Sequence, residues 1–310
     1  MLSYWNKLGN IFQPTAKSHP LLLTHASNPI ALHLKDDQFR IYFNGRDHKN
    51  RSSIGAFDFD LIKKRIISKY VNPFFTYDTR NSFFSDGLSL GGLYTYNNNI
   101  YILFMGWQKL KNKHWTGRIG RLKVNLDHTL ELDSTEPILD FDDTDKISFS
   151  YPCVIPRTTG GIDMWYGSTI SWGSEKNEMV HVINHAFSDD GLNWKKNGLA
   201  IPYKIGVAQA FSRPSIIING DGKYEMWFSY RSGKKNKLGI LEKYRIGYAY
   251  SYDNKKWILD LNNVGIQPSS TGWDSEMIEY PFVFHHRDKI YMLYNGNNFG
   301  ETGIGLAIKN

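Results

Sequence analysis

The sequence predicts an all-β protein, and more closely a five-bladed β-propeller of four-stranded antiparallel blades whose ring is closed by an N-terminal strand. Three observations lead to this prediction. Aromatic residues, which favour strands, make up 15% of the chain. One strand-like phrase recurs five times at nearly constant spacing, and one hairpin-like phrase recurs twice. No stretch of the sequence has the apolar periodicity of a long amphipathic helix.

The phrase that recurs five times is an apolar and aromatic run that ends in Gly or a small polar residue. Its copies are FRIYFNG (39–45), IYILFMG (100–106), IDMWYGS (162–168), YEMWFSY (224–230) and IYMLYNG (290–296). The equivalent positions are Phe43, Phe104, Trp165, Trp227 and Leu293, so the steps between copies are 61, 61, 62 and 66 residues. A period of this length indicates one supersecondary unit per copy. A two-sheet sandwich, the alternative fold, would not show such regular spacing.

Each copy has strand-like neighbours on both sides. A strand that opens near a proline precedes four copies, at 27–34, 151–156, 213–218 and 280–285, and the remaining copy has GGLYTY (91–96) instead. With a third strand in every copy and a fourth in most, the predicted blades span 27–80, 83–140, 148–205, 210–262 and 275–310 of a single domain, 1–310. The last blade lacks a strand. We expect the apolar segment HPLLLTHA (19–26) to supply it and to cover the exposed edge.

The phrase that recurs twice reads SDDGLNW (188–194) and SYDNKKW (251–257). Asp-Gly and Asp-Asn supply the positive φ angles of a tight turn, and the aspartate can accept hydrogen bonds from its own backbone. We interpret both copies as turns between outer strands of the third and fourth blades, without a direct role in function.

Charge and cysteine content limit the partners and the compartment. The formal net charge is +7, but the basic residues are scattered and no nucleic-acid-binding motif accompanies them, so we expect no nucleic-acid partner. The single cysteine, Cys153, permits no internal disulfide, which favours the cytoplasm. We also expect no membrane span and no signal peptide. Because no metal-ligand cluster, phosphate-binding loop or dinucleotide fingerprint occurs, we expect no metal or cofactor.

Charged residues gather near the ends of the predicted inner strands, where a propeller presents its pocket. The candidate catalytic residues are Asp47, Asp86, Glu276 and Glu279, and the candidate substrate-binding residues are Arg46, His48, Arg51, Arg213, Arg231, Tyr280 and Asn295. Glu279 adjoins the last inner strand and Asp47 follows the second strand of the first blade, so a closed ring would bring both into one pocket. Two carboxylates at close range raise the pKa of one of them, as a general acid requires.

Each of these candidates also has a structural interpretation. Asp47 can be neutralised by Arg46 and Arg51, and Asp86 can serve only as a turn residue. Arg213 precedes an inner-strand proline, where it can hold an anionic ligand or a catalytic carboxylate, or form an ion pair between blades.

Three segments resemble a known superfamily: IYFNGRDHKNRSSIGAFDFD (41–60), SRPSIIINGDGKYEMWFSYR (212–231) and WDSEMIEYPFVFHHRDKIYMLYNGNNFGETGIGLA (273–307). They look like the five-bladed glycosidases, namely arabinanases, β-xylosidases, invertases and levansucrases, with mannoside phosphorylases as relatives. The closest resemblance is to propeller proteins of bacterial surface-polysaccharide clusters, and it implies a carbohydrate ligand. Those glycosidases carry Asp before the first inner-strand proline, where this chain has Asn28. Their third-blade Asp and fourth-blade Glu are not evident either, so the catalytic trio does not carry over.

Two hypotheses of function follow. The first is an enzyme that acts on a glycosidic bond, by hydrolysis or glycosyl transfer, in bacterial surface-polysaccharide metabolism. Such chemistry needs an acid at the leaving oxygen and a second carboxylate on the other face of the sugar. The second hypothesis is a non-catalytic carbohydrate-binding or scaffold propeller in polysaccharide assembly. The expected ligand is a sugar, an oligosaccharide or a nucleotide sugar, and the basic surface is compatible with an anionic one.

Overall fold

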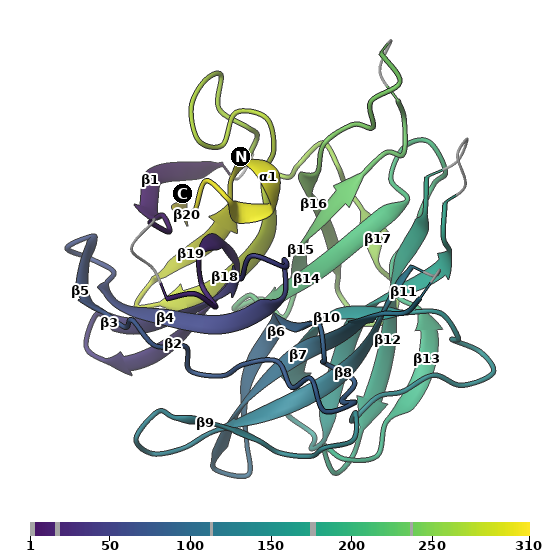
Figure 1. Cartoon of the computed structure of the whole chain (residues 1–310). Helices are drawn as coiled ribbons and strands as arrows, with labels where there is room; N and C mark the ends of the chain where they lie inside the picture. Colours follow the sequence, from purple (N-terminus) through teal and green to yellow (C-terminus); the bar gives the residue numbers. More distant parts are fainter. Residues whose placement is uncertain (1–3, 16–18, 112–113, 174–177, 236–237) are drawn as a thin grey trace.

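The computed structural model describes residues 4–15, 19–111, 114–173, 178–235 and 238–310 (Figure 1). Within these ranges the chain forms twenty β-strands and a single four-residue helical turn, α1 (Asn297–Gly300). The prediction of an all-β protein is therefore confirmed. Among the described residues, no helix has the length and hydrophobicity that a membrane crossing requires.

The strands are arranged in five antiparallel units of four strands each. Unit 1 comprises β2 (Thr24–Lys35), β3 (Gln38–Arg46), β4 (Ser52–Asp60) and β5 (Arg65–Lys69). Unit 2 comprises β6 (Gly87–Tyr96), β7 (Asn99–Lys109), β8 (Trp115–Val124) and β9 (Leu130–Leu132). Unit 3 comprises β10 (Phe149–Pro156), β11 (Ile162–Ser171), β12 (Val180–Ser188) and β13 (Lys195–Leu199). Unit 4 comprises β14 (Ala210–Ile218), β15 (Tyr224–Arg231), β16 (Arg245–Ser251) and β17 (Ile258–Leu259). Unit 5 comprises β18 (Glu279–His286), β19 (Lys289–Asn295), β20 (Ile304–Lys309) and β1 (Trp5–Phe12).

Single parallel residue pairs join some of these units into larger sheets. Ser52 pairs with Gly87 between units 1 and 2, and His181 pairs with Ala210 between units 3 and 4. The first strands of the units, β2, β6, β10, β14 and β18, lie against one another in that order, and β18 also lies against β2. Each first strand therefore has another first strand on either side.

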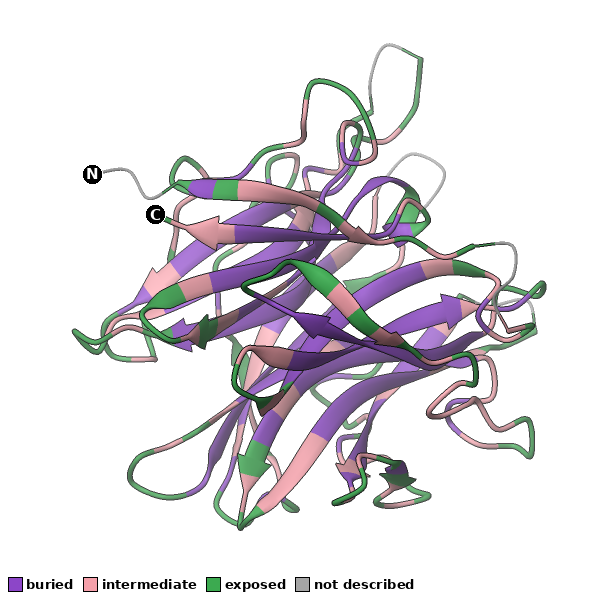
Figure 2. Ribbon diagram, turned by 90° about the vertical axis from the view of Figure 1, so that its left-hand side faces the viewer, coloured by how far each residue is buried: buried purple, intermediate pink, exposed green. Residues whose placement is uncertain are grey.

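Apolar side chains are buried at every junction between consecutive units, and Figure 2 shows the burial along the strands. The five clusters include Tyr42 with Phe104, Leu103 with Met164, Trp165 with Phe228, Trp227 with Tyr294, and Leu293 with Phe57. The last of these clusters joins unit 5 to unit 1. The aromatic residues of the repeated phrase thus fill the spaces between units, because strands present alternate side chains to opposite faces.

The N-terminal strand that completes unit 5 differs from the predicted one. β1 (Trp5–Phe12) pairs antiparallel with β20, and Figure 1 shows the two side by side. The prediction that 19–26 supplies this strand is wrong, since Thr24 already begins β2. The apolar character of that segment has another cause. Leu22 is buried directly over Gly45 and Gly55, where the missing side chains leave room for it.

Every first strand carries a bulge at the same place. Two residues leave the strand register after Ser27, Leu90, Ser150, Ser212 and Glu279. In four units these two residues are X-Pro, and X has a positive φ: 52° at Asn28, 38° at Tyr151, 53° at Arg213 and 51° at Tyr280. Proline cannot donate to the ladder, so it is accommodated at a bulge, and the bulge re-aims the residue before it. These bulges set the directions of Asn28, Tyr151, Arg213 and Tyr280.

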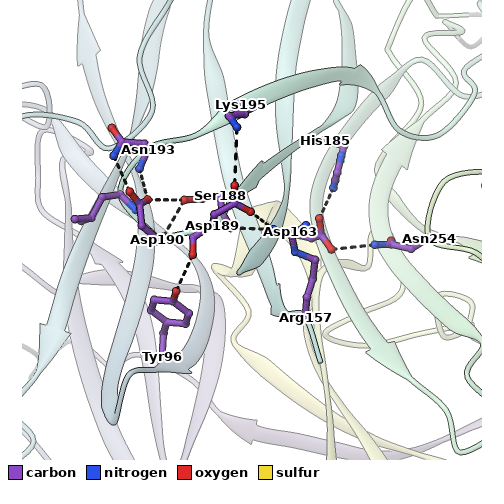
Figure 3. A network of polar contacts seen from close by, with 12 residues as sticks. Tyr96, Arg157, Asp163, His185, Ser188, Asp189, Asp190, Asn193, Lys195 and Asn254 are labelled. Atoms are coloured by element: carbon purple, nitrogen blue, oxygen red, sulfur yellow. Dashed lines mark hydrogen bonds and ion pairs between the residues drawn. The ribbon is translucent and has the colours of Figure 1, made fainter. Parts of the chain in front are cut away.

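The repeated hairpin phrase forms the predicted turns (Figure 3). Asp190 accepts hydrogen bonds from Ser188 Oγ (2.9 Å) and from the backbone N–H groups of Leu192 and Asn193 (both 2.8 Å). These donors lower the pKa of Asp190 below its usual value. The second copy repeats the arrangement, with Asp253 accepting from Ser251 Oγ at 3.0 Å.

Candidate functional site

A cleft of about 610 Å³ opens at the end of the molecule where the first strands begin and the second strands end. The first strands contribute Ser27, Asn28, Ser89, Ser150, Tyr151, Ser212 and Tyr280 to its lining. The second strands contribute Asn44, Arg46, Met105, Trp107, Lys109 and Arg231. The bulges therefore lie at the base of this cleft.

Two asparagines of unit 1 each bring a buried, unpartnered polar atom to the cleft. The Asn28 N–H donates to Asn295 Oδ1 (2.9 Å), but Asn28 Oδ1 has no hydrogen-bond partner among the described residues. Asn44 Oδ1 accepts from the Leu90 N–H (2.7 Å), whereas Asn44 Nδ2 likewise has no partner in the described part of the chain. A buried polar group without a partner costs about 1–3 kcal/mol. A ligand hydroxyl, which both donates and accepts, could satisfy this acceptor and this donor.

Glu279 is the most unusual titratable group near the cleft, and it directly precedes the lining residue Tyr280. Its side chain is fully buried, and neither carboxyl oxygen has a hydrogen-bond partner among the described residues. Burial raises the pKa of Glu279 well above its usual value, and the charges of Arg46 and Arg231 oppose that effect only in part. The environment therefore favours the protonated form of this carboxyl group.

Glu178 is the one carboxylate in the cleft lining within the described residues. Its Oε2 lies 3.0 Å from Arg231 Nη2 as an ion pair, although the angles fall short of a hydrogen bond. The Arg231 guanidinium also lies 4.7 Å from the centre of the Tyr244 ring. Burial, with smaller contributions from the charges of Glu279 and Glu178, raises the pKa of Tyr244. Both carboxyl groups therefore act on the cleft residue Tyr244.

Three tryptophans of units 2 and 3 and the segments beside them form an aromatic wall of the cleft: Trp107, Trp115 and Trp172. Trp107 Nε1 donates to Ser52 Oγ (3.0 Å), which fixes the ring against unit 1. Trp115 meets Trp172 edge to face at 4.9 Å, and His114 stacks on Trp172 at 4.7 Å. Large aromatic faces of this kind bind flat apolar surfaces.

His181, at the start of β12, is held in a neutral form. Its Nε2 lies 2.7 Å from Ser150 Oγ, and its Nδ1 lies 2.7 Å from Thr169 Oγ1. Burial lowers the pKa of His181 to about 3, so the imidazole ring is uncharged at neutral pH. Because both ring nitrogens are engaged by hydroxyl groups, this histidine positions Ser150 and Thr169.

Of the predicted site residues, Arg46, Arg231 and Tyr280 line the cleft. Asp47 does not line it. The Asp47 carboxylate accepts from the backbone N–H groups of Lys49 and Arg51 and is ion-paired with the Arg51 guanidinium at 2.8 Å. Arg51 and Asp47 thus stabilise a turn, and the charges that act on Glu279 are those of Arg46 and Arg231. No hydrogen bond joins Asp47 to Glu279 in the described part of the chain, and neither residue lines the cleft.

Four other predicted residues also lie outside the cleft lining. Asp86 accepts a hydrogen bond from the Lys109 N–H (2.8 Å), while Glu276 and His48 are exposed. Asn295 is buried, and its Nδ2 donates to the carbonyls of Ala26 (2.7 Å) and Gly303 (2.9 Å). Asn295 therefore ties unit 5 to unit 1 and, through its Oδ1, holds the backbone of Asn28.

Arg213 is buried among the first strands and does not line the cleft. Its Nη2 donates to the Pro29 carbonyl (2.8 Å), and its Nη1 donates to the Leu90 carbonyl. Burial lowers the pKa of Arg213 to about 10. Among the described residues Arg213 meets neither a catalytic carboxylate nor an ion-pair partner, because the main-chain carbonyls of Pro29 and Leu90 accept its hydrogen bonds instead. Contact with an anionic group of a ligand stays a prediction.

No three side chains of His, Cys, Asp or Glu lie close enough to hold a metal ion within the described ranges. The residues of the cleft that sequence analysis missed are chiefly Asn28, Asn44, Tyr151, Glu178 and the three tryptophans. The X-Pro pattern at the start of the first strands was a usable signal for Asn28 and Tyr151, since it marks the bulges.

Comparison with known proteins gives one close pair of relatives. The uncharacterised proteins MT1551 and Rv1502, from Mycobacterium tuberculosis strains CDC 1551 / Oshkosh and ATCC 25618 / H37Rv, are each 36% identical to this chain over 305 residues. The match covers 98% of this chain and 98% of each relative. No family model matches the chain.

Solved structures share the fold at low sequence identity. A glycoside hydrolase has a TM-score of 0.74 at 15% identity, covering 98% of this chain and 92% of its own. A second structure comes from a family of mannoside phosphorylases that contains glycoside hydrolases acting on β-1,2-mannosidic linkages in Candida mannan. It has a TM-score of 0.71 at 14% identity, covering 99% of this chain and 94% of its own. The chain therefore has a glycosidase-like propeller fold.

Proposed function

The chain belongs to the same protein family as Rv1502 and MT1551 and has a glycosidase-like fold, and from this premise we propose that it binds a carbohydrate in the cleft and acts on a glycosidic bond. On the resemblance of its sequence, we propose bacterial surface polysaccharide or its precursors as the source of that carbohydrate.

We also propose that the five units form one closed five-bladed propeller spanning the whole chain. The first strands contact one another in sequence order and β18 contacts β2, which supports a ring. The buried cluster between units 5 and 1 and the pairing of β1 with β20 support its closure. Such a ring would leave no unit with an uncovered face.

The observation that carries the carbohydrate proposal is the set of unsatisfied polar groups beside an aromatic wall. Asn28 offers an acceptor, Asn44 a donor, and Glu279 a carboxyl group, all buried without protein partners in the described residues. Sugar hydroxyls can satisfy all three, while the apolar face of a sugar ring can pack on Trp107, Trp115 or Trp172. This combination of few polar groups and large aromatic faces is typical of small-molecule sites.

For the chemistry, we propose Glu279 as the general acid and Glu178 as the second carboxylate. The raised pKa of Glu279 keeps a proton available at neutral pH, and donation to the glycosidic oxygen would release the leaving group. Glu178, ion-paired with Arg231, would stabilise the developing positive charge or activate the attacking water or acceptor hydroxyl. Because Glu279 has no exposed surface, the ligand must displace a neighbouring side chain to reach it. Asp47, Asp86 and Glu276 would then have no chemical role.

One observation favours a second function, a non-catalytic carbohydrate-binding protein. None of the four predicted catalytic carboxylates lines the cleft, and the lining carboxylate that the structure describes, Glu178, is already paired with an arginine. A cleft of this kind can hold a sugar without cleaving it.

Glu279→Gln tests the proposal, and Glu276→Gln is its matched control. Both changes keep the shape of the side chain, but Glu276 is exposed and outside the cleft. The purified proteins would be assayed against glycosides and nucleotide sugars, with and without inorganic phosphate. We expect Glu279→Gln to lower kcat by about 100-fold or more, with ligand affinity nearly unchanged, and Glu276→Gln to behave like the wild type.

The outcomes separate the two functions. Full turnover by Glu279→Gln would remove Glu279 from the mechanism. Binding of a sugar by the wild type without turnover of any compound in the panel would support the binding protein instead of the enzyme.

A further inference from the structure

The charged side chains of the cleft are mostly cationic. Among the described lining residues, the cations are Arg46, Lys109, Arg231 and Lys235, and Glu178 is the carboxylate. Glu178 is ion-paired with Arg231, and Glu279 favours its neutral form. Arg46 and Lys109 therefore give the cleft positive charge beyond its internal pair.

Arg46 carries part of this excess. It ends β3 and is half-buried, and no hydrogen bond or ion pair of its guanidinium is present among the described residues. The adjacent Asp47 does not neutralise it, because that carboxylate is engaged by Arg51. A half-buried guanidinium presents five N–H donors in a planar fork, which suits an oxyanion with several acceptor positions.

Arg231 supplies a second guanidinium near the same point. Its Nε is buried without a partner in the described part of the chain, so the pair with Glu178 leaves donor capacity unused. Arg46 and Arg231 both line the cleft, and the charges of both act on the buried carboxyl group of Glu279. Units 1 and 4 thus each contribute an arginine to the cleft, whereas the tryptophans come from units 2 and 3 and the segments beside them.

We propose that Arg46 and Arg231 together bind an anionic substituent of the ligand, either a carboxylate or a phosphate ester on a sugar, while the tryptophan wall packs against its neutral rings. This inference deepens the proposed carbohydrate function and rests on it for the sugar part of the ligand. Both kinds of anion accept charge-assisted hydrogen bonds from guanidinium forks. A Glu279 carboxyl group that keeps its proton avoids the repulsion that a carboxylate would exert on such a ligand.

Isothermal titration calorimetry with glucose, glucuronate, glucose 6-phosphate and inorganic phosphate tests this assignment. The proteins are the wild type, Arg46→Gln and the control Arg80→Gln, whose side chain is 88% exposed and paired with Asp78 outside the cleft. In the wild type we expect glucuronate, glucose 6-phosphate or both to bind about tenfold or more tightly than glucose. Arg46→Gln should abolish this preference and leave its melting temperature unchanged, while Arg80→Gln should retain it. Arg46→Lys should retain part of it, because charge remains without the planar fork.

A preference that survives in Arg46→Gln, or no wild-type preference for any of the three anions over glucose, would overturn the anion site. The identity of the tighter anion separates a sugar acid from a sugar phosphate. If inorganic phosphate binds in an Arg46-dependent way while no sugar binds, the anion site stands and the carbohydrate function fails. If glucose binds and none of the anions binds more tightly than glucose, the carbohydrate function stands and the anion site fails.

Discussion

The two ends of β12 differ in how the carboxyl groups around them are satisfied. At its last residue, Ser188, the hairpin begins, and the carboxylates nearby have protein partners (Figure 3). Asp163 accepts from His185 (3.0 Å) and from Asn254 of unit 4 (3.1 Å), and Asp190 accepts several hydrogen bonds within its own turn. The carboxylates at this end are satisfied without a ligand, and Asp163 ties neighbouring units together.

The other end of β12 opens on the cleft, where His181 contributes to the lining. Around that cleft, Asn28 Oδ1, Asn44 Nδ2 and both oxygens of Glu279 have no partner among the described residues. Buried polar atoms without partners occur at the hairpin end as well, at Arg157 Nε and Asn254 Oδ1, so such atoms alone do not mark the cleft. What sets the cleft end apart is Glu279, a buried carboxyl group without a hydrogen-bond partner among the described residues, whereas the carboxylates near the hairpin are hydrogen-bonded or ion-paired.

The largest loss of stability is expected from a change at Asp47, whose carboxylate already has several protein partners. Asp47→Ala should lower the free energy of unfolding by about 3 kcal/mol, because it removes a buried ion pair and two hydrogen bonds from backbone N–H groups. Urea denaturation would measure this loss. Ligand binding in the cleft should be unchanged below the melting temperature. A loss of ligand affinity without a loss of stability would show that Asp47 belongs to the functional site. The distinction between structural carboxylates such as Asp47 and the carboxyl groups of the site would then fail.

A smaller loss is expected at the hairpin end. Asp163→Ala removes two hydrogen bonds, one of them to Asn254 in the neighbouring unit, and should cost about 1–2 kcal/mol of unfolding free energy. Asp189→Ala is the control, because Asp189 is exposed and its ion pair with Arg157 is on the surface. Equal stabilities of the two variants would show that the interactions at the hairpin end do not hold the units together.

The third effect is the most diagnostic, and it concerns the dependence of stability on pH that Glu279 confers. Its pKa is raised in the folded protein above the ordinary 4.5. Its favourable contribution to stability is therefore fully present below about pH 4.5 and is lost as the pH rises through the folded-state pKa. Glu279→Gln cannot titrate, so the variant should gain stability relative to the wild type as the pH rises, by at most about 1.4 kcal/mol per pH unit.

Urea denaturation of both proteins at pH 5, 6.5 and 8 would reveal this trend. A difference in unfolding free energy that stays constant over the series would mean that Glu279 is ionised in the folded protein. The proposed general acid would then lack its proton.

The strand order could be predicted from the sequence because it depends on a local pattern that is repeated. Trp165 and Trp227 occupy equivalent positions and both fill junctions between units. The strand that completes unit 5 could not be predicted in the same way. Trp5–Phe12 is less apolar than 19–26. It is stabilised as a strand by contacts with distant residues, such as that of Trp5 with Trp227 at 5.3 Å.

The site was harder to predict than the strands because burial and hydrogen bonding decide which polar residues matter. Arg46, Arg231 and Tyr280 adjoin strand ends and do line the cleft. Asp47 and Asp86 adjoin strand ends as well, but their carboxylates accept hydrogen bonds from backbone N–H groups and do not line the cleft. Glu178 precedes β12 in a connection without a motif, so only the folded chain places it beside Arg231.

The pairing of β1 with β20 has a consequence for synthesis on the ribosome. β1 emerges first, yet its partner lies almost the whole length of the chain away. At about 5–20 residues per second, translation of the intervening chain takes roughly 15–60 s. During that time the backbone of β1 lacks its partner strand, although Phe12 can already pack on Phe43 and Phe57 of unit 1. The nascent chain thus carries an unpaired β1 until β20 has been synthesised. A chaperone would be of most use in that interval.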